Sequence, residues 1–131
     1  MRFLSQEWLD ERMRQAGSLT PTPGVDISVQ HVVPDAPDGP IRYYDVIKDG
    51  ILSSSGLGTI PNPDVTLTAG WQEQMGLMRG QLDVIGSFMS GRFNVDGDQM
   101  KLFALFRLAQ TQPLALTVIA RNLVDAVDVD A

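Results

Sequence analysis

Cysteine is absent from this chain of 131 residues, and histidine occurs once, at His31. The absence of cysteine excludes disulfide bonds, thiolate nucleophiles and zinc sites built from cysteine. With a single imidazole as well, the chain lacks the donors of an ordinary zinc centre, and an all-carboxylate site is the one arrangement left for a metal ion. We therefore expect no metal and no cofactor.

Positive charge and long apolar runs are also scarce. The chain has ten Lys and Arg residues and sixteen Asp and Glu residues, which gives a net charge of −6 and an isoelectric point of about 4.5. This balance argues against a nucleic-acid partner and against docking to anionic lipid surfaces through charge. No stretch approaches the length of a membrane span, and the first 17 residues have no apolar run typical of a signal peptide. We expect a cytoplasmic protein without stable membrane insertion.

The chain does have a globular composition, with 44% apolar and 20% charged residues. Its length suits one domain with one hydrophobic core. We expect residues 1–110 to form this domain. Residues 111–131 are expected to be a C-terminal extension, a helix or an edge strand followed by an acidic frayed tail, packed on the same domain.

Apolar periodicity predicts an α+β order of elements. A helix is expected over residues 6–15, where Ser5 is a suitable N-cap. Alternating apolar residues predict four strands, and a tight turn is expected between the second and third: residues 25–33, 41–48, 51–57 and 64–68. Three helices and a fifth strand are expected after them: residues 71–79, 83–90 and 98–109, with the strand at residues 92–96.

Consecutive hairpins among these strands predict a mainly antiparallel five-stranded sheet, with the helices packed on one face. The fifth strand follows a helical crossover, so it is the strand for which we expect a parallel neighbour.

Two glycine motifs stand in the second half of the chain. The first, L-x-x-G-x-L, covers residues 77–82, and the second, F-x-x-G-x-h-x-h-x-G-D with h apolar, covers residues 88–98. Together with the D-x-T-L-T strand at residues 64–68, they resemble the second half of a sterol carrier protein type-2 (non-specific lipid-transfer) domain. The resemblance covers residues 5–109 and is most specific from residue 64 onward.

The resemblance implies a sterol-carrier-protein-like fold with a tunnel between its helices and its sheet. It implies an apolar small molecule as ligand, such as a lipid, fatty acyl chain, sterol or polyketide-like compound, in a carrier or transfer role. Methionines and aromatic residues on the helical faces suit an adaptable apolar site. The residues expected to line it are Trp71, Met75, Met78, Phe88, Met89, Phe93, Leu102, Phe103 and Phe106.

Two alternatives stay open. If residues 34–40 join the first two strands as a hairpin, facing residues have numbers that sum to about 74–76. His31 then lies beside Tyr43 and Asp45, and these three residues are candidates for acid–base catalysis of a cyclisation or isomerisation of an apolar substrate. In the other alternative, the C-terminal extension fills the cavity and the chain is an interaction module that forms a homodimer.

Overall fold

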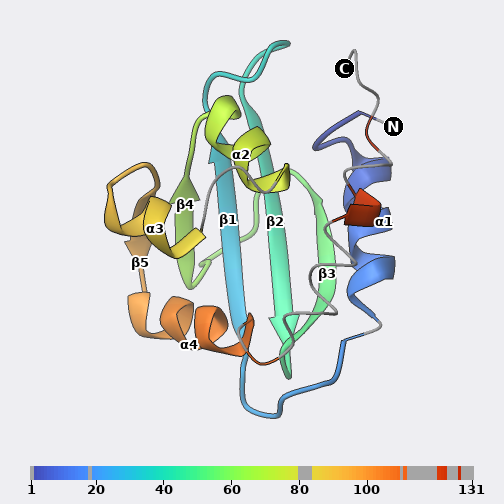
Figure 1. Ribbon diagram of the computed structural model, residues 1–131, viewed down its shortest axis with the longest axis vertical. Coiled ribbons are helices and arrows are strands. Elements are labelled where there is room, and N and C mark those ends of the chain that lie inside the picture. Colours follow the sequence, from blue (N-terminus) through green and yellow to red (C-terminus); the bar gives the residue numbers. More distant parts are fainter. Residues whose placement is uncertain are drawn as a thin grey trace.

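The computed structural model describes residues 2–17, 19–79, 84–109, 111, 121–123 and 127. The helices and strands of this part of the chain follow one another in the predicted order (Figure 1). Their order is α1 (Gln6–Ala16), β1 (Ile27–Val33), β2 (Ile41–Lys48), β3 (Ile51–Leu57), β4 (Val65–Thr68), α2 (Trp71–Met78), α3 (Val84–Met89), β5 (Asn94–Gly97) and α4 (Gln99–Ala109). None of the helices in the described ranges is long and apolar enough to cross a membrane.

The strands described here form a five-stranded sheet in the order β3-β2-β1-β4-β5. β2 pairs antiparallel with both β1 and β3, and β5 pairs antiparallel with β4, whereas β4 runs parallel to β1. The mainly antiparallel sheet is confirmed, but the expectation of a parallel neighbour for the fifth strand is wrong. β3 is an edge strand, so the chain has to cross the sheet before β4 can pair with β1. Because of this crossing, β4 runs in the same direction as β1.

A buried glutamine fixes that crossing. The side chain of Gln30, 6% exposed in the middle of β1, accepts a hydrogen bond of 2.9 Å from the backbone N–H of Ile60. Its amide nitrogen donates to the backbone carbonyls of Gly58 and Tyr43, at 3.0 Å each. Because successive strand residues point to opposite faces, Gln30 faces away from His31. The segment between β3 and β4 is therefore held on the outer face of the sheet.

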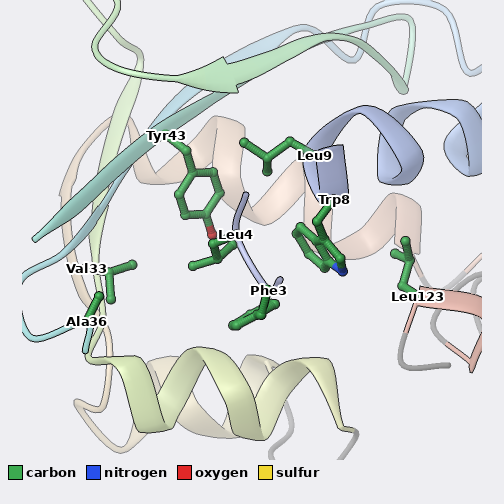
Figure 2. Close-up of a cluster of buried hydrophobic side chains, with 8 residues drawn as sticks. All are labelled: Phe3, Leu4, Trp8, Leu9, Val33, Ala36, Tyr43 and Leu123. Carbon is green, nitrogen blue, oxygen red and sulfur yellow. The ribbon is translucent and has the colours of Figure 1, made fainter. Parts of the chain in front are cut away.

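The inner face of the sheet carries two apolar clusters, and apolar side chains of all four helices belong to them or pack against them. The α1 cluster joins the residues before and within α1 to β1, β2 and a later residue: Phe3, Leu4, Trp8, Leu9, Val33, Ala36, Tyr43 and Leu123. Figure 2 shows these side chains in the space between the sheet, α1 and α2. The α4 cluster joins β1 and β4 to the segments around β5 and α4: Ile27, Val29, Val65, Leu67, Ala69, Phe93 and Leu102.

Local signals fix the ends of several elements. Ser5 Oγ accepts a hydrogen bond of 3.2 Å from the Trp8 N–H and caps α1, as predicted. Asp49 and Gly50 both have positive φ, at 51° and 77°, as the tight turn between β2 and β3 requires. β5 begins at Asn94 and not at residue 92, because Asn94 faces Thr68, the last residue of β4, and no ladder partner remains before it.

The predicted C-terminal extension falls largely outside the described residues, as does residue 83, where a helix is predicted to begin. Within the extension, Leu123 is buried in the α1 cluster and Val127 packs against that cluster. The packing of residues 111–131 on the same domain, as a C-terminal extension, stays a prediction.

Candidate functional site

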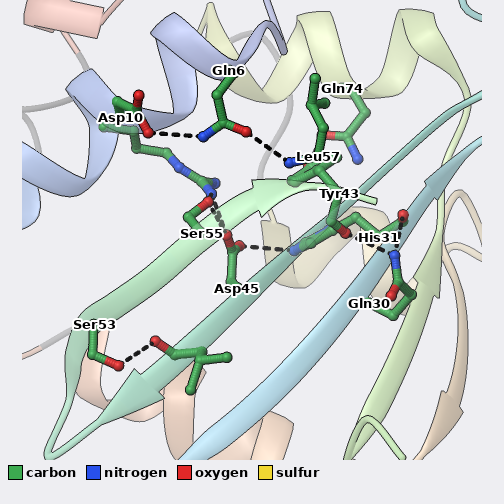
Figure 3. Close-up of polar contacts among 12 residues, drawn as sticks. Gln6, Asp10, Gln30, His31, Tyr43, Asp45, Ser53, Ser55, Leu57 and Gln74 are labelled. Carbon is green, nitrogen blue, oxygen red and sulfur yellow. Dashed lines mark hydrogen bonds and ion pairs between the residues drawn. The ribbon is translucent and has the colours of Figure 1, made fainter. Parts of the chain in front are cut away.

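A polar group interrupts the apolar inner face at the middle of β1 and β2. His31 pairs with Tyr43 across the two strands, as the hairpin register predicts. The two rings are stacked, with their centroids 4.2 Å apart and their planes at 2°. His31 Nε2 lies 2.9 Å from Asp45 Oδ2, and both side chains are largely buried (Figure 3). The structure therefore brings together the three residues that the catalytic alternative names.

Asp45 is the charged centre of this group. Its Oδ1 forms an ion pair with Arg12 of α1 and accepts a hydrogen bond of 2.9 Å from the hydroxyl of Ser55 in β3. Arg12 also donates to the same hydroxyl, at 3.0 Å. Burial raises the pKa of Asp45, but the Arg12 charge and the hydrogen bonds from His31 and Ser55 outweigh it, so that the pKa falls to about 2. Asp45 is thus ionised at neutral pH and is no proton acceptor there.

Tyr43 contacts α2 through its hydroxyl and α1 through its ring. Its hydroxyl donates a hydrogen bond of 3.2 Å to Gln74 Oε1 on α2, and the Arg12 guanidinium lies 5.7 Å from the centroid of its ring. Burial raises the pKa of Tyr43 well above its usual range. Tyr43 is therefore neutral, and it ties the sheet to α2.

Arg12, Ser55 and Gln74 are members of this polar group that the sequence analysis did not identify. Ser55 pairs with Asp45 in the hairpin of β2 and β3, so the hairpin register would have found it. Arg12 stands one turn after Trp8 on α1 and its guanidinium lies 5.4 Å from that ring, but no sequence signal places α1 over β2 and β3.

Three buried nitrogens of this region have no hydrogen-bond partner among the described residues: His31 Nδ1, Arg12 Nε and Trp8 Nε1. A buried polar atom without a partner costs about 1–3 kcal/mol. The hydrogen-bonding capacity of this buried region is therefore not fully used by the described residues.

The structure divides the predicted lining residues between the two clusters. Trp71, Met75 and Met78 of α2 pack against the α1 cluster. Phe93 and Leu102 belong to the α4 cluster, and Phe88 and Phe106 pack against it. Phe103 is 37% exposed and Met89 is 76% exposed. Phe88, Phe103 and Phe106 touch one another edge to face, with ring centroids 5.6–6.4 Å apart.

Helix α2 does not bury its large apolar side chains fully. Its buried residues are Gln74 and Gly76. The apolar side chains of Trp71, Met75 and Met78 are only partly buried, although they stand at the i, i+4 and i+7 positions of one face. The apolar face of α2 is therefore only partly removed from water.

A separate groove of about 420 Å³ lies at the end of β1 and β2 near α4. It is lined by charged residues, among them Asp26, Lys48 and Asp64, and by the apolar residues Ile27, Val46 and Ile47. The Ser28 N–H and the Lys101 ammonium both bond to Asp64, and these contacts lower its pKa. No cluster of three or more possible metal ligands occurs in the described ranges.

Comparison with solved structures gives the fold. A sterol carrier protein 2 crystal structure matches 92% of this chain and 98% of its own, with a TM-score of 0.71 and 14% identity. Palmitated SCP2L2 from Aedes aegypti matches 88% of this chain and 95% of its own, at a TM-score of 0.59 and 22% identity. The sec-alkylsulfatase Pisa1 from Pseudomonas sp. matches 79% of this chain at a TM-score of 0.51 and 23% identity, but this chain spans only 14% of its length.

No protein family matches the sequence, and no curated protein matches it significantly. The fold is that of the sterol carrier protein 2 class, an α+β sheet with helices on one face, as the sequence resemblance implies. The α2 face and the polar group around His31 both lie on the covered side of that sheet.

Proposed function

We propose that this chain binds an apolar small molecule between the helices and the inner face of the sheet, and that it carries this molecule. The ligand class is a lipid, fatty acyl chain, sterol or polyketide-like compound. The observation that carries the proposal is the half-buried apolar face of α2, formed by Trp71, Met75 and Met78, which packs against the α1 cluster. An apolar guest removes this face from water, which is the main favourable term in such binding.

The magnitudes suit this kind of ligand. Burial of one methylene contributes about 0.8 kcal/mol, so a chain of about a dozen methylenes gains on the order of 10 kcal/mol before the cost of association. Micromolar binding therefore needs no charged anchor. Methionine is flexible and adapts to guests of different shape, which favours a broad range of apolar ligands.

The likeness in fold supports the same class of ligand. One of the similar structures is palmitated, and several others are sterol carrier proteins or resemble them. The site that we propose contains the nine predicted lining residues, but Met89 has a different place in it. Met89 is 76% exposed, so we place it at the rim of the site, and the other eight line it.

Lipid extraction and native mass spectrometry of the purified protein test the proposal. We expect a co-purifying apolar molecule, or displacement of a bound fluorescent fatty acid by added lipid.

Met75→Gln puts a polar amide into the proposed site. We expect it to weaken binding about tenfold, because the lost apolar contact is worth about one or two buried methylenes. Met100→Gln is the matched control, because Met100 is 72% exposed. Absence of any bound molecule together with no probe binding would contradict the proposal.

Catalysis on an apolar substrate is a second candidate, and the contact of His31 with Asp45 favours it. Asp45 is ionised and Tyr43 is neutral at neutral pH, so the catalytic role in this trio falls to the imidazole of His31, which lies against both. The candidate predicts that His31→Ala abolishes turnover of a bound substrate and leaves its binding intact. Unchanged turnover in this variant would rule out the role.

A further inference from the structure

His31 stands at the boundary between the two apolar clusters. On its own strand and face, Val29 belongs to the α4 cluster and Val33 to the α1 cluster. Its cross-strand neighbours divide in the same way, since Leu67 belongs to the α4 cluster and Tyr43 to the α1 cluster. An extended guest that contacts both clusters therefore passes His31.

One nitrogen of the imidazole is already engaged. Nε2 lies 2.9 Å from Asp45 Oδ2, and an ionised carboxylate only accepts hydrogen bonds, so Nε2 carries the proton of this contact. Arg12 already balances the charge of Asp45 through the ion pair on Oδ1. The neutral imidazole therefore leaves the polar group without net charge, which is the favourable state in an apolar interior.

The other nitrogen is then an acceptor with a fixed position. In the neutral ring with a proton on Nε2, Nδ1 holds a lone pair. Nδ1 is buried, and no described residue bonds to it. Stacking on Tyr43 and the contact with Asp45 hold the ring from two directions. A guest with an O–H group would satisfy this acceptor, whereas a carboxylate brings no proton and a second negative charge near Asp45.

We propose that His31 Nδ1 accepts a hydrogen bond from a hydroxyl of the bound molecule, so that the preferred ligand is a neutral long-chain alcohol and not the corresponding acid or ether. The inference rests on the proposed function and names the ligand class of the same site. The polar group between the two clusters fixes the orientation of the guest, and the clusters provide affinity for its apolar body.

Competition between three matched compounds tests the inference. Displacement of a fluorescent fatty acid is measured at neutral pH with 1-dodecanol, dodecyl methyl ether and lauric acid. The ether has the chain and the oxygen of the alcohol but no O–H donor. We expect the alcohol to bind wild-type protein about tenfold more tightly than the ether, which is the usual contribution of one hydrogen bond, and more tightly than lauric acid.

His31→Phe keeps an aromatic ring on Tyr43 and removes Nδ1. In this variant the alcohol and the ether are expected to bind equally, with the ether as tight as in wild type. Ser55→Ala is the control, because it removes a hydrogen bond to Asp45 but leaves the imidazole unchanged, so that the preference for the alcohol persists. A preference for the alcohol that survives in His31→Phe would overturn the inference.

Because His31 is the only histidine, nitrogen NMR of ¹⁵N-histidine-labelled wild-type protein gives a second measurement that needs no folded variant. We expect the Nδ1 resonance to move when 1-dodecanol binds and to stay in place with the ether. Equal binding of alcohol and ether, or an unmoved resonance, overturns this inference and leaves the proposed function standing. Failure of all three compounds to displace the probe overturns both.

Discussion

Among single residues, Asp45 makes the most polar contacts on the inner face of the sheet. It receives Arg12 from α1, His31 from β1 and Ser55 from β3. An ion pair removed from water gains little net stability, but loss of one partner leaves the other charge buried and unpaired. Asp45 therefore fixes where α1 lies on the sheet more than it adds to the free energy of folding.

Asp45→Asn tests this role. The variant leaves the Arg12 charge, whose side chain is 20% exposed, without its counter-charge, and we expect the free energy of unfolding to fall by about 3 kcal/mol. Urea unfolding measures the change. Asp38→Asn is the matched control, because it breaks the exposed ion pair with Arg2 and should cost less than about 1 kcal/mol. Equal losses in the two variants would show that burial does not matter here.

The same residue predicts a dependence of stability on pH. The pKa of Asp45 falls from 3.8 to about 2 on folding, so its contribution is fully present above pH 3.8 and is lost as the pH falls through about 2. The linked free energy is roughly 2 kcal/mol. Unfolding of wild type and Asp45→Asn as a function of pH checks this. The gap between their stabilities should narrow in this window, and a constant gap would contradict the assigned pKa.

At the scale of elements, the connection from β5 to α4 depends on glycine. Gly97 ends β5 with a φ of 117°, and a Cβ there would lie 2.3 Å from the carbonyl oxygen of Asp64. That oxygen also accepts the N–H of Asp98 at 2.8 Å, where α4 begins. The close approach of β4 and β5 therefore leaves no room for a side chain at Gly97.

Gly97→Ala is expected to lower the free energy of unfolding by about 3 kcal/mol, because backbone strain and overlap add. Gly91→Ala is the control. Gly91 also has a positive φ, of 80°, but nothing lies within 4 Å of its Cβ position, so we expect a loss of about 1 kcal/mol. Thermal and urea unfolding of both variants measure the difference. A Gly97 variant no less stable than the Gly91 variant would contradict the packing of β5.

The elements themselves were largely predictable, because their signals are local. Alternation defined β1 to β3, caps and glycines defined the helices, and the hairpin register placed His31 beside Tyr43 and Asp45. The parallel pairing of β4 with β1 was not predictable in this way. It depends on a crossing held by Gln30, and nothing local distinguishes that residue from a solvent-facing glutamine.

The candidate site was predictable in part. The apolar residues of α2, α3 and α4 carry the helical spacing that predicts an inward face. The expectation that Met89 shares the inward face with Phe88 was wrong, because successive helix residues point about 100° apart and Phe88 is the one that packs against the α4 cluster. Arg12 was missed for another reason, because its contact with Asp45 joins residues far apart in the sequence.

For the whole molecule, the arrangement is one sheet face shared by two apolar clusters, with a polar group between them. In Figure 1, α2 crosses in front of the central strands, α1 lies beside β3 and α4 lies toward the opposite end of the sheet. The helices thus surround the middle of the inner face, where His31 lies. A molecule bound there would be enclosed by α2 and would touch both clusters.

Methyl NMR of the six methionines locates the bound molecule directly. Protein labelled at the methionine methyl groups is titrated with 1-dodecanol, and nuclear Overhauser contacts between these methyls and the alkyl chain are recorded. Met75 and Met78 should shift and show contacts to the chain, while the 72% exposed Met100 stays unchanged. Saturable binding that perturbs Met100 and leaves Met75 and Met78 unperturbed, or no contact with any methionine, would contradict the account.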